Sequence, residues 1–147
     1  MKKLLPPSYF TFCLALTVLI HYLVPLKQII NYPYNLFGFV FFLFGGILNI
    51  WTDQLFKKNK TTVKPEEKPS VFIQTGPFKI SRNPMYLGMA ILLIGIGFIL
   101  GSIISITGLV LFIILIQVVF IPKEEKLLKE QFGEEYETYM KRVRRWI

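Results

Sequence analysis

Hydrophobic residues in this chain fall in long blocks rather than at the spacing of an amphipathic helix or strand. The longest block, residues 85–121, runs for 37 positions without a charged residue. A single helix of that length would extend about 55 Å, whereas the hydrocarbon core of a bilayer is about 30 Å thick. The block must therefore fold back on itself, and we predict the turn at Gly101 and Ser102, near its middle. This pattern is typical of an integral membrane protein.

Four apolar segments predict four transmembrane helices. Two lie in the first half of the chain, at about residues 9–26 and 34–51, and the longest block provides two more, at about 85–100 and 103–121, joined as a tight hairpin. The first segment follows basic residues, as a signal peptide does, but no small-x-small cleavage site comes after it, so we expect it to be retained. The sequence thus predicts an all-α membrane fold in which residues 1–147 form a single domain.

The second apolar segment carries residue types that indicate contacts with its neighbours. Gly38, Gly45 and Gly46 would allow another helix to approach closely. Polar residues gather where the segment ends, and they indicate either a polar pocket or a solvated helix end: Asn49, Thr52, Asp53 and Gln54.

Two longer polar segments flank the predicted hairpin. The first, residues 56–82, is rich in lysine and has one apolar patch, residues 71–73, which we expect to lie against the membrane surface. The second, residues 123–146, follows Pro122, which we expect to end the fourth span. Its apolar residues recur at helical spacing and predict an amphipathic helix with a bend at Gly133: Leu128, Phe132, Tyr136, Met140 and Val143. This helix would either lie on the membrane or fold back under the bundle.

Lys and Arg outnumber Asp and Glu by 17 to 9, which gives a net charge of +8. In a membrane protein such charges set the orientation and contact anionic headgroups, so we expect membrane lipids as partners and no nucleic acid. Of the 17 basic residues, 2 precede the first span, 7 lie between the second and third spans, and 7 follow the fourth; the other two connections hold 1 and 0. We therefore expect a multi-pass protein with both termini in the cytoplasm, as in a prokaryotic inner membrane.

The composition excludes two kinds of site. Cys13 is the single cysteine, so no internal disulfide or cysteine-pair metal site can form, and its apolar surroundings indicate a packing residue. His21 is the single histidine, which excludes a histidine-rich metal site. We interpret His21 as a polar residue at the membrane interface and expect no metal.

Residues 75–88 contain two corners where the polar segment meets the apolar block. Gly76 and Pro77 form a typical turn pair. The residue before a proline favours extended geometry, and proline suits the first position of a helix. We therefore predict Asn83 as the N-cap and Pro84 as the first helical residue. By itself this stretch indicates only the start of a helix.

The predicted topology brings two polar groups to the same end of the hairpin. Arg82 and Asn83 lie beside the free N–H groups at the start of the third span, a place that attracts carboxylates and phosphates. Glu124 and Glu125 directly follow the fourth span, where they would bind an ammonium group or ribose hydroxyls. The alternative for these glutamates is structural, because acidic residues stabilise the first turn of any helix.

In these residues the chain resembles the isoprenylcysteine carboxyl methyltransferases and phospholipid methyltransferases, which are related families of integral membrane enzymes. The resemblance covers the second half of the chain, from Val71 onward. Before the hairpin it rests on Gly76, Pro77, Phe78, Lys79, Arg82, Asn83, Pro84, Tyr86 and Gly88. After the hairpin it rests on Glu124, Glu125, Leu128, Phe132, Gly133, Tyr136, Tyr139, Arg142 and Val143. Asn83 stands where the carboxyl methyltransferases have histidine, although asparagine also occurs in the phospholipid branch.

The resemblance implies that S-adenosylmethionine binds at the cytoplasmic end of the hairpin. Glu124 and Glu125 would form one wall of its pocket, and the other wall would consist of Arg82, Asn83, Pro84, Tyr86, Leu87 and Gly88. The reaction would move a methyl group to a lipophilic small molecule or lipid through a carboxylate, amine or thiol.

Two residues are candidates for catalysis. By the resemblance, Arg142 would orient the carboxylate of an acceptor. An amine acceptor would instead have to lose a proton, and Glu125, Glu124 or Asp53 would accept it. Arg142 and Glu125 are therefore the predicted catalytic residues.

Two other functions remain open. Sterol-type membrane reductases have a similar Arg-His-Pro-x-Tyr stretch and C-terminal tyrosine pattern, but they use NADPH and generally have more spans. A non-enzymatic membrane protein would instead use the basic tail to bind lipid. The length of 147 residues favours the methyltransferase over the reductase.

Overall fold

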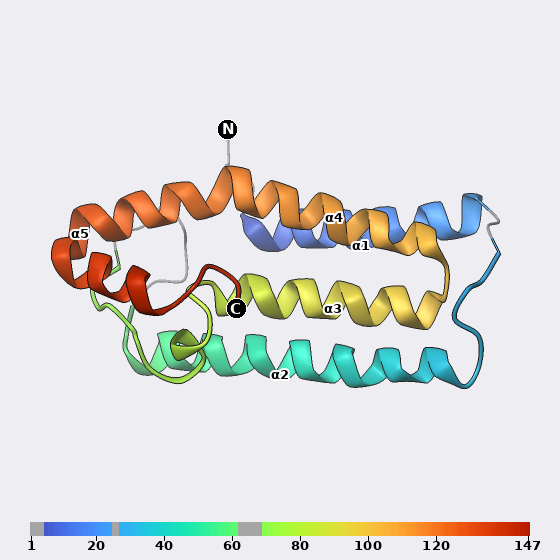
Figure 1. Cartoon of the computed structure of the whole chain (residues 1–147), viewed down its shortest axis with the longest axis horizontal. Helices are drawn as coiled ribbons and strands as arrows, with labels where there is room; N and C mark the ends of the chain where they lie inside the picture. Colours follow the sequence, from blue (N-terminus) through green and yellow to red (C-terminus); the bar gives the residue numbers. More distant parts are fainter. Residues whose placement is uncertain (1–4, 25–26, 62–68) are drawn as a thin grey trace.

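The computed structural model describes residues 5–24, 27–61 and 69–147, and within these ranges the chain is helical with no strand (Figure 1). The main helices are α1 (Pro6–Leu23), α2 (Phe37–Lys58), α3 (Pro84–Leu100), α4 (Ile106–Leu115) and α5 (Ile121–Arg142). Shorter helical turns are η1 (Tyr34–Leu36), η2 (Gly76–Lys79), η3 (Ile103–Ser105) and η4 (Ile116–Phe120). The predicted end of the first span at residue 26, and residues 62–68 of the predicted polar segment, lie outside the described residues.

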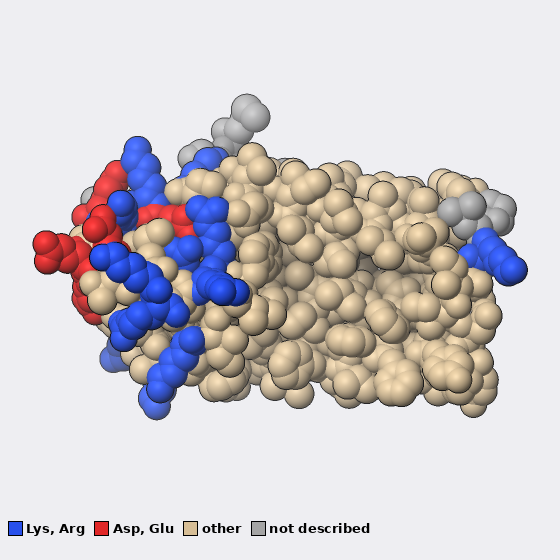
Figure 2. Space-filling view, viewed as in Figure 1, with Lys and Arg blue, Asp and Glu red and all other residues tan. Residues whose placement is uncertain are grey.

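The helices α1 to α4 form an elongated bundle (Figure 1). By length and composition, three helices of the described chain are able to cross a membrane: α1, η1 with α2, and the continuous helix from Ile103 to Arg142. Helix α3 is also apolar but shorter, at 17 residues. Most charged side chains gather at one end, and the rest of the visible surface is largely uncharged (Figure 2). The predicted all-α integral membrane fold is confirmed.

Helices α2 and α3 pack backbone against backbone through glycines. A Cβ atom added to Gly38 would lie 2.5 Å from the carbonyl oxygen of Gly95, and one added to Gly45 would lie 2.6 Å from that of Gly88. Real side chains do not tolerate such distances, so only glycine permits this approach. The predicted role of Gly38 and Gly45 is thereby confirmed. The prediction for Gly46 is wrong, because nothing lies within 4 Å of its added Cβ.

The turn between α3 and η3 lies at Gly101 and Ser102, as predicted. Gly101 has φ 70°, a left-handed conformation that favours glycine. Its carbonyl oxygen accepts hydrogen bonds from the backbone N–H groups of Ile29 and Ile30, at 2.8 and 3.1 Å. His21 reaches the same turn, where its Nδ1 lies 2.8 Å from the hydroxyl oxygen of Ser102. The turn is therefore fixed by the loop after α1 as well as by its own backbone.

The helix does not end at Pro122, where we predicted the end of the fourth span. The chain continues from α4 through the π-helical turn η4 into α5, and Pro122 lies in the first turn of α5. Proline lacks an N–H and its ring crowds the carbonyl four residues earlier, whereas a π turn is wider and shifts the hydrogen bonding by one residue. The wide turn directly before Pro122 accommodates the ring. The predicted tail helix is consequently the continuation of α4 (Figure 1).

Helix α5 changes direction at Gly133, where φ 48° and ψ −123° are not helical. The predicted bend is confirmed, and beyond it the chain turns back toward the bundle (Figure 1). Phe72 fills the bend: its ring stacks on Phe132 at 5.1 Å and meets Tyr139 edge-on at 5.2 Å. Phe72 therefore packs on aromatic rings of α5, and Ile73 is buried, whereas the expectation that residues 71–73 lie against the membrane surface stays a prediction.

The main hydrophobic core lies between α1, α3 and the α4–α5 helix. Cys13 is fully buried in it, which confirms its predicted packing role. Phe112 and Ile116 are equally buried, and Tyr86 extends the cluster to the charged end of the bundle. The core thus holds the start of α3 firmly against the start of α5.

Candidate functional site

A hydrogen bond joins the first turns of α3 and α5. Tyr86 lies in α3 two residues after Pro84, and Glu124 lies in α5 two residues after Pro122. The phenol of Tyr86 donates to the Oε1 atom of Glu124. Tyr86 is buried, and Glu124 is partly buried. The two segments that the sequence brought to one end of the hairpin are therefore in direct contact.

The environment of Glu124 keeps its carboxyl group near its point of ionisation. Burial raises the pKa of Glu124 from an ordinary 4.5 to about 7. The hydrogen bond from Tyr86 acts in the opposite direction, and the charge of Glu125 raises the pKa further. At neutral pH this carboxyl group can therefore hold or release a proton.

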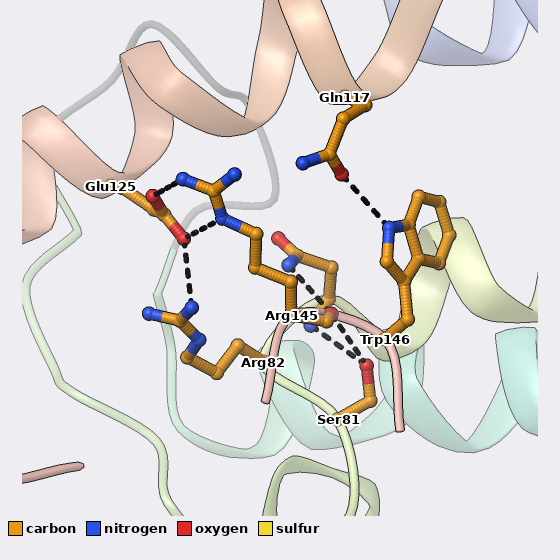
Figure 3. A network of polar contacts seen from close by, with 7 residues as sticks. Ser81, Arg82, Gln117, Glu125, Arg145 and Trp146 are labelled. Atoms are coloured by element: carbon orange, nitrogen blue, oxygen red, sulfur yellow. Dashed lines mark hydrogen bonds and ion pairs between the residues drawn. The ribbon is translucent and has the colours of Figure 1, made fainter. Parts of the chain in front are cut away.

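Glu125 is bound by two arginines (Figure 3). Arg145 donates from Nε to Oε1 at 2.9 Å and from Nη2 to Oε2 at 2.6 Å. Arg82 approaches the same carboxylate more loosely, with Nη2 3.3 Å from Oε1. The side chains of Arg82 and Glu125 are only 9% and 13% exposed. Two guanidinium groups thus face one carboxylate, and the side chains of Arg82 and Glu125 have little contact with solvent.

Residues 143–146, which we call the C-terminal strap, lie across the start of α3. The carbonyl of Arg145 accepts hydrogen bonds from the hydroxyl of Ser81 at 3.1 Å and the Nδ2 of Asn83 at 2.9 Å. The backbone N–H of Arg82 donates to the carbonyl of Arg144 at 2.9 Å. Trp146 anchors the far side, because its indole Nε1 donates to Oε1 of Gln117 at 2.9 Å (Figure 3). The strap is thus bonded to the residues directly before α3, to α5 and to the π turn η4.

The strap also changes the role of Asn83. Asn83 does occupy the N-cap position of α3, as predicted, but its side chain makes no capping hydrogen bond. Its amide donates to the strap instead, while its backbone N–H donates to the hydroxyl of Ser81 at 3.1 Å. The prediction of a side-chain cap is wrong, because the carbonyl of Arg145 competes for that side chain.

A cavity of about 190 Å³ opens beside the contact between Tyr86 and Glu124. Aromatic rings form part of its wall, and those of Phe56 and Phe78 meet edge-on at 5.6 Å. The remaining lining comes from the starts of α1 and α3: Leu5, Pro6, Pro7, Arg82, Asn83, Pro84 and Met85. Aromatic faces with a carboxylate suit an organic cation, and a guanidinium suits an anionic group.

Comparison with known proteins shows the family of the chain. A family model described as phospholipid methyltransferase matches residues 34–135, from η1 through α3 and α4 into α5. The match covers well over half of the chain and includes Tyr86 and both glutamates. The chain belongs to the phospholipid methyltransferase family. Membership makes it a membrane methyltransferase by class.

Part of the chain is also similar to a second protein. It is an uncharacterized protein of Haemophilus influenzae, 36% identical over 63 residues. The matched region covers 43% of the present chain and the whole of the relative. This similarity therefore adds no activity to what the family shows.

The phospholipid methyltransferase fold brings five of the predicted site residues to the cavity: Arg82, Asn83, Pro84, Tyr86 and Glu124. Leu87, Gly88 and Glu125 are not part of its lining. Gly88 faces α2, where an added Cβ would lie 2.8 Å from the side chain of Asn49. The roles predicted for these residues in cofactor binding stay predictions.

Two other candidates, Arg142 for orienting an acceptor and Asp53 for accepting a proton, lie elsewhere. Arg142 is exposed, and its Nη2 donates to Oε1 of Gln74 at 3.1 Å rather than toward the cavity. Asp53 forms a surface ion pair with Lys57, 2.6 Å away. The catalytic role predicted for Arg142 stays a prediction, as does that of Glu125.

Sequence reasoning missed several residues of this site. Arg145 and Trp146 follow the family motifs without any pattern of their own, and Phe56 belonged to a segment expected to be a loop. Gln117 offered the clearest signal, because an amide in a charge-free apolar block needs a hydrogen-bonding partner. That partner is the indole of Trp146.

Proposed function

We propose that this member of the phospholipid methyltransferase family uses S-adenosylmethionine to methylate a lipophilic or membrane-bound acceptor at the cytoplasmic face. The observation that carries the proposal is the hydrogen bond from Tyr86 to Glu124, which unites the two family motifs at one cavity. The family match supports methyl transfer over the reduction carried out by sterol-type enzymes.

The residues around the cavity fit this cofactor. A sulfonium and an ammonium group are both cations, and the aromatic rings of Phe56 and Phe78 with the carboxylate of Glu124 suit them. Arg82 supplies a guanidinium for a carboxylate. The cavity of about 190 Å³ is smaller than the about 300–1,000 Å³ of usual ligand pockets, so as it stands it would hold only part of S-adenosylmethionine.

When bound, S-adenosylmethionine would supply a methyl group that is already activated. The chain then has to hold the reactants in line and exclude water. The apolar core around Tyr86 shields the cavity on the membrane side, and Tyr86 holds the carboxylate of Glu124 in place. No metal and no covalent nucleophile is needed for this chemistry.

Glu124 is the proposed base for an amine acceptor. It borders the cavity, whereas both oxygens of Glu125 are bound by arginines and Asp53 is paired with Lys57. With a pKa of about 7 it can accept a proton at neutral pH. A carboxylate or thiolate acceptor would need no base, and for a carboxylate we retain Arg142 as the proposed orienting residue.

The proposed orientation places the cavity in the cytoplasm. Its lining comes from the starts of α1, α3 and α5 and from the end of α2, so these termini share one end of the bundle. That end carries most of the charged side chains (Figure 2). Basic residues mark the cytoplasmic side of membrane proteins, which supports cytoplasmic termini. An apolar acceptor tail would stay in the bilayer while its polar head enters the cavity.

A transfer assay tests the proposal. The purified protein in lipid vesicles is incubated with S-adenosylmethionine labelled in the methyl group and with phosphatidylethanolamine, a prenylated cysteine, a fatty acid or a small thiol. We expect label on one of these acceptors and at least about a tenfold loss for Glu124→Ala, whereas Glu137→Ala on the exposed side of α5 keeps full activity. NADPH-dependent reduction of a sterol-type substrate without any label would favour the reductase instead.

A further inference from the structure

The carboxylate of Glu125 is shared unequally between its two arginines. Arg145 forms two short hydrogen bonds with it, at 2.9 and 2.6 Å, in the two-pronged geometry that binds carboxylates best. Arg82 makes a single contact with this carboxylate, at 3.3 Å, and its guanidinium also lies near the phenol of Tyr136. Glu125 is therefore mainly the partner of Arg145.

Because Glu125 is bound mainly to Arg145, the guanidinium of Arg82 retains hydrogen-bond donors without an acceptor among the described residues. Its side chain is 9% exposed, and its Nε and Nη1 atoms have no hydrogen-bond partner within the described part of the chain. Burying charged donors without an acceptor is costly, so such a group favours the arrival of an anion. Arg82 also borders the cavity at Tyr86 and Glu124.

We propose that Arg145 is a positioning residue: it occupies both oxygens of Glu125 and so keeps the guanidinium of Arg82 available for an anionic group of a ligand in the cavity. The group is a carboxylate or a phosphate, the two anions that a guanidinium binds best. This inference rests on the proposed function, in which the carboxylate belongs to S-adenosylmethionine and the phosphate to a phospholipid acceptor.

The strap holds Arg145 where this role requires it. Its carbonyl is bonded to Ser81 and Asn83, the residues on either side of Arg82. On its C-terminal side, Trp146 is bonded to Gln117. The guanidinium of Arg145 is therefore presented to Glu125 from a segment that is fixed at both ends (Figure 3).

Removing Arg145 would redirect Arg82. Glu125 would then have Arg82 as its nearest cation, at a starting distance of 3.3 Å. In a full ion pair with Glu125, Arg82 would donate to this carboxylate the hydrogen bonds that it would otherwise donate to the ligand. The anion should bind more weakly even though Arg82 itself is intact, and removing the charge of Glu125 as well should restore binding.

Equilibrium titration of the detergent-purified full chain with S-adenosylmethionine tests this chain of effects. If the anion is the carboxylate of S-adenosylmethionine, we expect Arg145→Ala to weaken its binding about tenfold, Arg145→Lys to weaken it less, and Arg145→Ala with Glu125→Gln to return to within about threefold of the wild type. Arg144→Ala is the matched control. The side chain of Arg144 is exposed, and the bond from the N–H of Arg82 to the backbone carbonyl at position 144 remains in the variant. The affinity of this variant for S-adenosylmethionine should equal that of the wild type. A merely structural role for Arg145 predicts that Glu125→Gln gives no rescue, and that result overturns the inference.

Two further probes identify the source of the anion. If the anion is the carboxylate of the cofactor, Arg145→Ala weakens the binding of S-adenosylmethionine but does not change the binding of its decarboxylated analogue. If it is a lipid phosphate, the affinity for S-adenosylmethionine stays constant, while binding of phosphatidylethanolamine vesicles falls and Glu125→Gln restores it. A wild type that binds S-adenosylmethionine, with no effect of Arg145→Ala on either ligand, overturns this inference alone. A wild type that binds neither ligand overturns the proposed function and this inference together.

Discussion

Tyr86 and Glu124 are 38 positions apart in the chain, yet the phenol of the first donates a hydrogen bond to the carboxylate of the second. The hairpin makes this possible, because α3 leads away from the charged end and α4 returns to it after the turn at Gly101. Each residue lies two positions after a proline in the first turn of its helix. The contact ties the two family motifs into one site.

The pKa of Glu124 gives the site a defined pH dependence. Since burial raises this pKa to about 7, the carboxylate that would face a cationic ligand is present above pH 7 and is lost below it. We expect S-adenosylmethionine to bind several-fold more tightly at pH 8 than at pH 6. Titration of the wild type at a series of pH values measures this.

Two variants separate Glu124 from other acidic groups. Glu124→Gln should remove most of the dependence between pH 6 and 8, whereas Glu137→Gln, on the exposed side of α5, should leave it as in the wild type. An unchanged pH profile in Glu124→Gln would show that a different group controls binding.

Neighbouring glycines in α2 should respond differently to the same substitution. A methyl group at Gly45 would lie 2.6 Å from the carbonyl oxygen of Gly88, so Gly45→Ala forces α2 and α3 apart and should cost about 1–3 kcal/mol. At Gly46 the same group meets nothing within 4 Å, and Gly46→Ala should change stability by less than about 0.5 kcal/mol. Thermal unfolding in detergent compares the two variants. Equal melting temperatures of Gly45→Ala and Gly46→Ala would contradict a close contact at Gly45.

The bend in α5 requires a backbone conformation at Gly133 that favours glycine. An added Cβ would meet nothing within 4 Å, but φ 48° and ψ −123° are strained for any other residue. Gly133→Ala should therefore lower the free energy of unfolding by about 1–3 kcal/mol. The neighbouring exposed position supplies the control, Glu134→Ala, which should have little effect. A fully stable Gly133→Ala protein would mean that α5 returns to the bundle without this conformation.

The parts of the fold that follow from local chemistry were predictable from the sequence. A charge-free block too long for one span has to turn, and Gly101 is the residue that permits it. Asn83 and Pro84 mark a helix start for equally local reasons. The meeting of Arg82 and Tyr86 with the two glutamates followed from the hairpin and from the order of the motifs.

The parts that were missed depend on tertiary contacts. Whether a helix continues past Pro122 depends on the π turn before it, which has no pattern in the sequence. The strap has no regular secondary structure, so the positions of Arg145 and Trp146 come from their partners Glu125 and Gln117 rather than from a periodicity. For the same reason the side chain of Asn83 donates to the carbonyl of Arg145 instead of capping α3.

The central claim is that the cavity beside Tyr86 and Glu124 binds S-adenosylmethionine, and a direct binding titration tests it. The detergent-purified protein should bind S-adenosylmethionine at one saturable site, which S-adenosylhomocysteine competes for and NADPH does not. Glu124→Ala should weaken this binding by at least about tenfold, since it removes the carboxylate at the cavity wall. Saturable binding of NADPH with no binding of S-adenosylmethionine would contradict the account.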